Sequence, residues 1–507
     1  MKCRKAYAII PVGENDRSAH VAQQKAPEVA TPGLFYKSTI FSTYQKGDNH
    51  MAYRVTQRII SSDDPLYPYF DDLCRKSKLL YNAALFRVRN IFTGYDKEHR
   101  TENEVEVFQE VALLQRSYPN MHVRRMISYT HLEKMMRVTE NPDFFSGLPR
   151  QTAQQMVKQS VTDFKNWLAS LREYKKHPEK YLGKPKMPRY KKSDLTTVII
   201  TNQDAVLYRD DIGMSLKLPL QKQRLYFSNL SSDPVLKEVK IKPYYGRFLL
   251  CLTLEEPDVA FDPSGSHVCA IDLGTDNFAA IVCDDHSSAI YKGGAVLSKI
   301  QWFHKQRAKY VSIITKGHEK KHAVSKRLRD LSFHYANFVK DQCHKISRSI
   351  IDFCMEHQCG TLILGVNLLW KQRSNMNKIN NQNFVSMPIT LLRTMITYKA
   401  LNAGIRIIEQ EESYTSKADL IANDRIPTYG VDDKDASFSG KRIKRGLYRC
   451  SNGMILNADC HAAANIMRKA IPDIWKDTRD YTFLSAPDVY GFHKLNPKGI
   501  PVKGIAA

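Results

Sequence analysis

The feature that most constrains this sequence is a short apolar run that ends in a carboxylate and a glycine. It reads Val268-Cys-Ala-Ile-Asp272-Leu-Gly, which is typical of a buried strand that leads into a tight turn. Together with the strand-like and helix-like patterns after it, this strand gives the order βββαβαβα, which ends with a strand at 405–409 and a helix at 458–470. This order predicts an α/β domain whose first strand presents Asp272 at its end.

Further acidic residues stand at the ends of later elements of this domain. Asp459 begins the last predicted helix, where an N-cap aspartate is the ordinary alternative. Glu411 and Glu412 follow the strand at 405–409, and side-chain alternation turns one of them inward and the other outward. Carboxylates that converge from separate elements suit the two Mg²⁺ ions of phosphodiester hydrolysis, because Mg²⁺ prefers oxygen ligands. Taken singly, each acid also fits a turn, a cap or a surface position.

The charge of the chain points to a polyanionic partner. It carries 76 Lys and Arg against 52 Asp and Glu, a formal net charge of +24. Two basic segments that contain an aromatic residue are candidates for contact with nucleic acid. Their residues are Lys184, Lys186, Arg189, Tyr190, Lys191 and Lys192 in the first segment, and Lys441, Arg442, Lys444, Arg445 and Tyr448 in the second. A solvated charged surface is the alternative for both.

The first half of the chain reads differently from the α/β part. Residues 1–50 show no sustained period, and we expect the folded body to start near Met51 with an alternating strand. Helical patterns fill most of residues 63–182, and short β-like runs come after them. No run of 18 or more apolar residues occurs, so we expect no membrane span.

The ten cysteines are scattered, and none of them forms a CxxC pair. A disulfide framework and a zinc ribbon are therefore not expected, and a reducing compartment fits. Cys354 and Cys359 lie near a predicted helix end, where together with His357 they are candidates for a metal site. Buried thiols are the ordinary alternative for these two cysteines.

Several stretches carry a recognisable pattern. They are AIDLGTDNFAAI at 270–281, HKISRSII at 344–351, NQNFVSMP at 381–388, EESYTSKA at 411–418, FSGKRIKRGLY at 438–448 and NADCHAAANIMRK at 457–469. In this order they resemble the motifs of the TnpB family, the transposon-encoded RNA-guided nucleases related to compact type V CRISPR effectors. The resemblance runs from about Met51 to Lys469, with weaker matches in the first half.

The resemblance implies a multidomain α+β protein. A wedge β-barrel is interrupted by a helical recognition lobe and is followed by an RNase H-like (RuvC) α/β nuclease domain. The expected boundaries are 1–50 for a poorly structured extension, 51–62 for the first wedge strand, 63–182 for the lobe, 183–262 for the rest of the barrel, 263–475 for the nuclease domain and 476–507 for a C-terminal tail.

The resemblance also assigns the site, with two departures from the family pattern. The usual second acid would end the strand at 361–364, but Gly365 stands there; a relocated glutamate before a Tyr-Thr-Ser stretch, seen in some relatives, favours Glu412. We therefore expect Asp272, Glu412 and Asp459 to be catalytic and to bind two Mg²⁺ ions, with Glu411 as the fallback. The zinc-binding module of most relatives is replaced by a basic loop at 413–458, so no zinc is expected.

The implied activity is RNA-guided cleavage of double-stranded DNA beside a short flanking motif, at one RuvC site. The partners are a guide RNA and the target DNA, without a membrane, in the prokaryotic cytosol. A monomer is expected, with a homodimer as the alternative. Two rival functions remain: a guide-directed DNA-binding repressor with an inactive nuclease, and an RNA-independent nuclease associated with a transposon.

Overall fold

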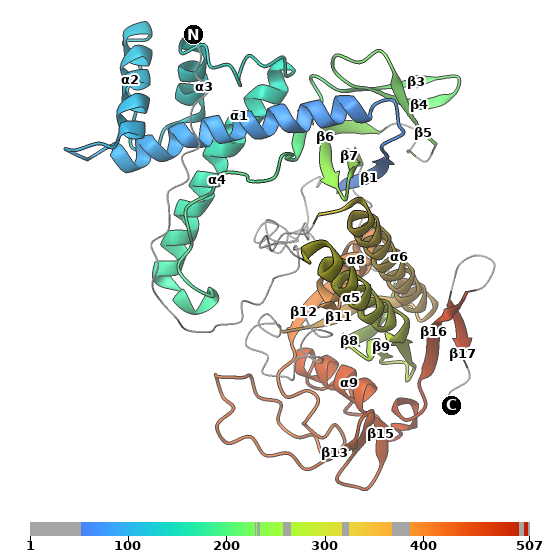
Figure 1. The fold of residues 1–507 in the computed structure, drawn as a ribbon. Helices are drawn as coiled ribbons and strands as arrows, with labels where there is room; N and C mark the ends of the chain where they lie inside the picture. Colours follow the sequence, from blue (N-terminus) through green and yellow to red (C-terminus); the bar gives the residue numbers. More distant parts are fainter. Residues whose placement is uncertain are drawn as a thin grey trace. The chain divides into compact units, whose positions relative to one another are not determined.

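The computed structural model describes residues 52–228, 230, 234–256, 265–316, 324–367, 386–495 and 501–504. The expected extension at 1–50 and most of the stretch at 381–388 lie outside the described residues. Residues 45–507 group as one unit. Its helical part, three smaller sheets and a large mixed sheet confirm the predicted multidomain α+β class (Figure 1).

Four helices follow the first strand: α1 (Tyr67–Gly94), α2 (Glu102–Ser117), α3 (Tyr129–Val138) and α4 (Arg150–Lys176). Helix α1 begins with Pro68 in its first turn and buries an apolar stripe that includes Phe70 and Leu80. The Thr101 side chain and Glu104 form a capping box that starts α2. Among the described helices, none is both long and apolar enough to cross a lipid bilayer.

The strand before these helices joins strands that come after them. Strand β1 (Ala52–Ile60) pairs antiparallel with β7 (Arg247–Glu256) in a sheet of order β1-β7-β6-β2, with β6 at Val235–Tyr244 and β2 at Val198–Thr201. A separate sheet contains β3 (Val206–Asp210), β4 (Gly213–Lys217) and β5 (Arg224–Phe227). The helices are therefore inserted between strands of one sheet, as expected. That these strands close into a barrel stays a prediction.

The large sheet has the order β12-β11-β8-β9-β10-β16-β17. Its strands are β8 (His267–Asp272), β9 (Asn277–Cys283), β10 (Ser288–Lys292), β11 (Cys359–Val366), β12 (Arg406–Glu411), β16 (Asp488–Leu495) and β17 (Pro501–Gly504). Strands β8, β11 and β12 run parallel, whereas β9 is antiparallel to β8. The expected tail at 476–507 thus supplies two strands, which were missed because its short aromatic run showed no clear alternation.

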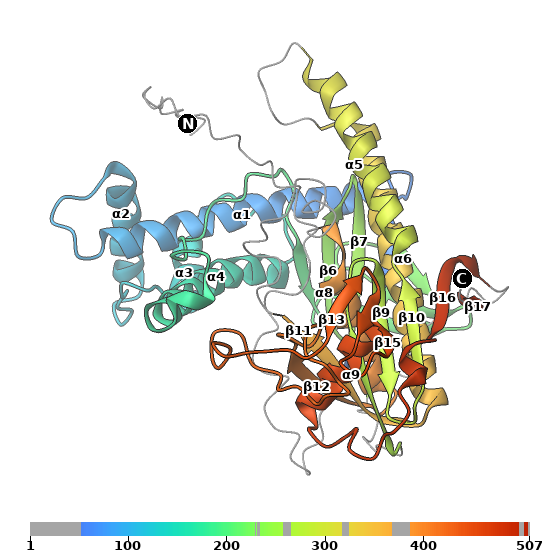
Figure 2. The ribbon, with the colours of Figure 1, turned by 90° about the horizontal axis from the view of Figure 1, so that it is seen from below.

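Side-chain alternation divides this sheet into two packed faces. On β8, Cys269 and Ile271 belong to the core formed with α5 (Gly294–Thr315), α6 (Lys326–Glu356) and α8 (Ile389–Asn402). Ala270, between them, belongs to the opposite core, which helix α9 (Ala458–Ala470) completes. Figures 1 and 2 show α9 on one side of the strands and α5 and α6 on the other. Helix α9 therefore brings Asp459 to the sheet that carries Asp272.

Candidate active site

The carboxyl ends of three parallel strands meet at one edge of the sheet. Asp272 is the last residue of β8, and the register pairs Ile271 with Leu364 of β11. On the other side of β11, Val366 pairs with Glu411, and the Glu412 N–H donates to the Val366 carbonyl at 3.3 Å. The pairing therefore lines up Asp272, Gly365 and Glu412 across three adjacent strands.

The side chain of Glu412 lies over Gly365. A Cβ atom placed on Gly365 would stand 2.8 Å from Oε2 of Glu412 and 2.6 Å from Cδ1 of Ile466. Both distances are shorter than real Cβ contacts, so no other residue type fits at 365 unless these neighbours move. The absence of an acid at the end of β11 and the presence of Glu412 after β12 are therefore linked, because the Glu412 side chain fills the space above the glycine.

Glu411 is engaged in a different direction. Its Oε2 accepts a hydrogen bond from Lys469 Nζ at 2.7 Å, and its Oε1 accepts one from the backbone N–H of Ser413 at 2.7 Å. Burial raises the pKa of Glu411, but the hydrogen bonds from Lys469 and Ser413 outweigh this effect and lower it. Glu411 is therefore held as a charged partner of Lys469, which leaves Glu412 as the acid that faces Asp272.

Asp459 approaches the same edge from the first turn of α9. Asn457 caps this helix, because its Oδ1 accepts hydrogen bonds from the N–H groups of Asp459 and Cys460. The carboxylate of Asp459 is consequently not needed as a cap. It accepts hydrogen bonds from Asn277 Nδ2 at 2.6 Å and from an Arg442 guanidinium nitrogen at 3.2 Å. Asn277 was missed in the sequence, although it lies in the same turn motif as Asp272.

Asp272 is repelled by the other two acids. Burial raises the pKa of Asp272 well above its ordinary value, and the charges of Glu412 and Asp459 raise it further. Burial, followed by the charge of Glu411, raises the pKa of Glu412 to about 7, while Arg393 opposes the shift. The structure therefore brings together the three acids that the sequence nominated.

The donor set fits a hard divalent cation, because it consists of carboxylate oxygens with too little positive charge around them. Arg442 and Asn277 donate hydrogen bonds to Asp459, and the charge of Arg442 offsets only part of the rise in the pKa of Asp272. The three acids are nevertheless more widely spaced than the ligands of one ion, because their oxygen atoms do not all lie within 4.8 Å of one another. Among the described residues, the triads that meet this spacing are Cys269, Cys354 and Cys359, and His267, Cys283 and Asp284.

The segment between Glu412 and Asp459 is anchored to α9 by polar side chains. Asn465 Nδ2 donates to the carbonyls of Thr415 at 2.9 Å and Ala418 at 2.7 Å. Arg468 donates to Asn423 Oδ1 at 2.6 Å and to the Asp424 carbonyl at 2.8 Å. These bonds fix the start of a segment that goes on to three short strands, β13 (Lys441–Lys444), β14 (Leu447–Arg449) and β15 (Ile455–Asn457).

Within this segment, the basic residues and the aromatic residue occupy different places. Arg445 pairs with Asp276 in the turn after β8, and its side chain is otherwise exposed. Tyr448 corrects our expectation of a surface contact: it is 1% exposed, stacks on the buried ring of His461 at 3.9 Å and donates to the Lys417 carbonyl. Its burial comes from packing on α9, which the local sequence does not reveal.

The first basic segment lies along helix α1. The Asn82 side chain donates to the Lys191 carbonyl and accepts from its N–H, and Arg89 donates to the Pro188 carbonyl. Lys191 turns its ammonium group over the Tyr81 ring at 4.3 Å, and burial lowers its pKa. The other nominated residues of this segment are exposed: Lys184, Lys186, Arg189, Tyr190 and Lys192.

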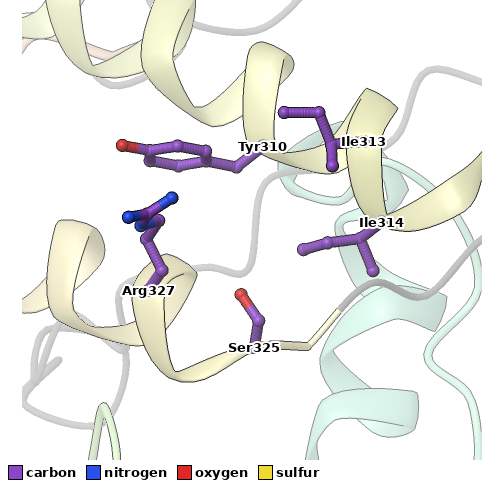
Figure 3. Close-up of a pocket in the computed structure, with 5 residues that line it drawn as sticks. All are labelled: Tyr310, Ile313, Ile314, Ser325 and Arg327. Carbon is purple, nitrogen blue, oxygen red and sulfur yellow. The ribbon is translucent and has the colours of Figure 1, made fainter.

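A surface pocket lies between the end of α5 and the start of α6. Tyr310, Ile313, Ile314, Ser325 and Arg327 line it (Figure 3), and the Arg327 guanidinium stands 5.4 Å from the centre of the Tyr310 ring. The lining contains no carboxylate and none of the nominated residues. We therefore assign the chemistry to the acidic edge of the sheet and not to this pocket.

We expect Glu412→Gln to stabilise the protein at alkaline pH in the presence of a chelator. The folded chain binds this proton more tightly than the unfolded chain, because the pKa rises from 4.5 to about 7. The resulting stability is complete below the unfolded pKa and is lost as the pH rises through about 7. A neutral glutamine avoids this loss, so the variant should gain about 1–3 kcal/mol near pH 8, seen as a higher melting temperature.

Glu411→Gln is the matched control, since it removes the neighbouring charge. This substitution breaks the ion pair with Lys469, so its melting temperature should fall at the same pH. Melting temperatures that shift in the same direction for both variants would contradict the different roles of the two glutamates.

Two family models match the chain, next to each other. The model described as a probable transposase, OrfB_IS605, matches residues 251–370, and the Cas12f1-like TNB domain matches residues 390–466. They cover β7 through β11 and α8 through most of α9, and therefore the stretches that carry all three acids.

Two curated relatives agree with these matches. The chain is 29% identical over 218 residues to the CRISPR-associated endodeoxyribonuclease Cas12f1 of Sulfoacidibacillus thermotolerans. The aligned stretch covers 41% of this chain and 46% of that protein. It is 25% identical over 216 residues to the TnpB-like protein ORF457 of Acidianus two-tailed virus, 41% and 43% of the two chains. The matches thus span less than half the length of each relative.

Solved structures are more distant. A Cas12f1 chain from a complex with sgRNA and target DNA aligns with a TM-score of 0.42 and 15% identity, over 79% of this chain and 82% of that one. A chain of CasPhi-2 (Cas12j) aligns with a TM-score of 0.34 and 9% identity, over 82% and 91%. On the sequence matches, the chain is related to the TnpB-like proteins and the compact type V CRISPR effectors.

Proposed function

We propose that this protein is an RNA-guided endonuclease that hydrolyses double-stranded DNA beside a short flanking motif. One observation carries the proposal: the partly buried Asp272 is repelled by two further acids, Glu412 and Asp459, which come from separate elements. Such a cluster destabilises a fold unless a cation compensates it, so it is seldom purely structural. The relation to an endodeoxyribonuclease and to TnpB-like proteins supports DNA as the substrate.

The site suits two Mg²⁺ ions held by Asp272, Glu412 and Asp459. When bound, such ions stabilise the charge on the attacking and leaving oxygens of the phosphodiester. Glu412 has a pKa of about 7 in the metal-free protein, so above this pH its carboxylate accepts a hydrogen bond and orients the attacking water. Asn277 and Arg442 keep the Asp459 carboxylate turned toward the edge of the sheet.

This chain belongs, on our proposal, to the relatives with a relocated glutamate and without the zinc-held module. The position of Glu412 above Gly365 supports the first feature, because the carboxylate fills the space that a side chain at 365 would need. The hydrogen bonds from Asn465 and Arg468 support the second, because they anchor the segment after Glu412 through side chains of α9. The inactive-nuclease alternative loses its main motivation, since the acid missing at 365 has a substitute.

Cleavage assays test the proposal directly. The RNA that co-purifies with the protein is sequenced, and labelled duplexes complementary to it are offered with Mg²⁺. We expect Asp272→Ala and Glu412→Gln to lower the cleavage rate by about a thousandfold or more, and Glu411→Gln to retain most of the activity.

Each alternative has its own outcome in this assay. Wild-type protein that binds the matched duplex without cutting it in any divalent metal is a guided repressor. Cleavage that is independent of the co-purified RNA identifies an unguided nuclease. If the Asp272→Ala variant still cleaves the duplex with its guide, the three acids are excluded as the catalytic site.

The basic segment along α1 gives a second test, of contact with nucleic acid. Replacement of the exposed Lys184, Lys186 and Lys192 by methionine should reduce the salt dependence of duplex binding by about 2–3 in log–log slope, because each lost phosphate contact removes about 0.9. The matched control Lys191→Met removes an ammonium that faces Tyr81 and should leave the slope unchanged. Fluorescence anisotropy across a salt series measures both, and equal slopes for the triple variant and wild type would exclude contact.

A further inference from the structure

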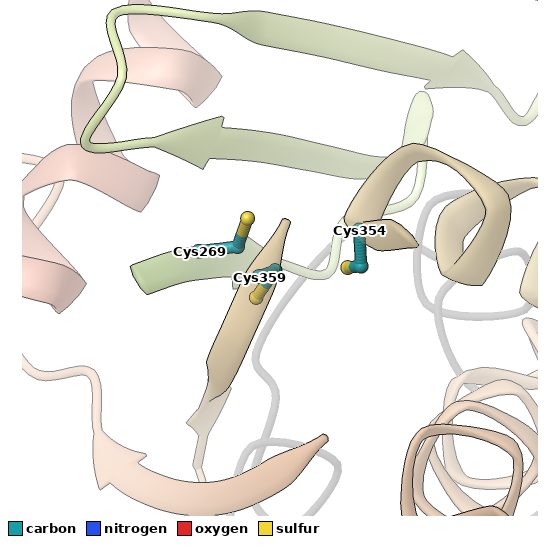
Figure 4. A group of neighbouring side chains, drawn as sticks. All are labelled: Cys269, Cys354 and Cys359. Atoms are coloured by element: carbon teal, nitrogen blue, oxygen red, sulfur yellow. The ribbon is translucent and has the colours of Figure 1, made fainter. Parts of the chain in front are cut away.

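Three buried thiols gather at the amino-terminal end of the strands whose other end carries the acids. Cys269 is the third residue of β8, Cys359 is the first residue of β11, and Cys354 lies in the last turn of α6 (Figure 4). Their sulfur atoms all lie within 4.8 Å of one another. Cys269 and Cys354 are fully buried and Cys359 is 5% exposed, so the cluster belongs to the interior of the domain.

The backbone around Cys359 makes this convergence possible. Gln358 has a positive φ of 49°, which turns the chain sharply from α6 into β11. Gly265 and Gly360 then touch: a Cβ on Gly265 would stand 2.5 Å from the carbonyl carbon of Cys359. The β8–β11 register is irregular between Cys359 and Thr361, and Cys359 pairs with His267, two residues before Cys269 on β8.

The cluster offers sulfur ligands alone. Among the described residues, the group that shares this 4.8 Å spacing consists of Cys269, Cys354 and Cys359, with no acid or histidine among them. The thiolate is the form of cysteine that binds metals. His357 does not belong to this group of neighbouring ligand atoms, and its Nδ1 pairs with Asp285 at 2.7 Å.

We propose that Cys269, Cys354 and Cys359 form a structural site for a thiophilic cation, Zn²⁺. We assign Cys283 as the fourth ligand, because it pairs with Cys269 across β8 and β9. Its sulfur lies 3.7 Å from Asp284 Oδ1 in the metal-free protein and would turn toward the other three when an ion binds. Zn²⁺ prefers four ligands in a tetrahedron, with thiolate sulfurs at about 2.3 Å, whereas the Mg²⁺ expected at the acids prefers oxygen.

This inference departs from our expectation of no zinc, which was based on the lack of CxxC pairs. Here the ligands come from two adjacent strands, a helix end and the strand beyond it, so their sequence spacing carries no motif. A bound ion would tie the end of α6 to β8, the strand that ends in Asp272. The site is independent of the proposed nuclease activity and is tested without it.

Metal binding is measured on the full chain, purified in reductant without chelator. Metal analysis should find one Zn²⁺ per chain, and exchange with Cd²⁺ should produce the ultraviolet absorption of thiolate–Cd²⁺ charge transfer, which carboxylates do not give. Cys359→Ser and Cys354→Ser should lose this absorption. Cys251→Ser, a buried cysteine of β7 outside the cluster, should keep it.

Two results would overturn the proposal. The first is wild-type protein that shows no thiolate absorption with Cd²⁺, including the case in which the thiols are found oxidised to a disulfide. The second is absorption that persists in both cluster variants. If the variants fail to fold, X-ray absorption spectroscopy at the zinc edge tests the proposal on the wild-type protein alone. Sulfur neighbours at about 2.3 Å from the zinc support the site, and oxygen or nitrogen neighbours alone exclude it.

Discussion

Repulsion between carboxylates that are forced to one edge of a sheet is the constraint on which this structure depends. Asp272 is fixed there by its strand, Glu412 by the pairing of β12 with β11, and Asp459 by the first turn of α9. None of these acids can leave without breaking a strand pair or a helix start. The strain is spread over elements far apart in the sequence, and on our proposal a bound divalent cation relieves it.

If Glu412 is the second catalytic acid, as we propose, the site keeps its chemistry although the position of this acid in the sequence has changed. In a parallel pair of strands, the ends of β11 and β12 are neighbours, so a longer side chain from β12 reaches the space above β11. Gly365 makes this possible, because its missing Cβ leaves room for the Glu412 carboxylate. Lys469 completes the arrangement by holding Glu411 in the opposite direction.

Periodic patterns were sufficient to predict strands β8 to β12 and the helices packed on them, and the motif order nominated the three acids that the structure brings to one edge of the sheet. The partners of these acids were not predictable, because Asn277 and Arg442 meet Asp459 only after the sheet, the helix and the loop have assembled. Tyr448 was misjudged for the same reason: its burial comes from stacking on His461 of α9. Strand β16 was missed because its pairing with β10 is non-local, and β17 was missed with it because β17 pairs with β16.

The most direct test of the account is a crystal structure of the full chain soaked in Mn²⁺, with anomalous scattering used to locate the metal. The account predicts strong peaks between the carboxylates of Asp272, Glu412 and Asp459, with Glu411 still bound to Lys469. Peaks elsewhere, or a site that Glu412 does not approach, would contradict it.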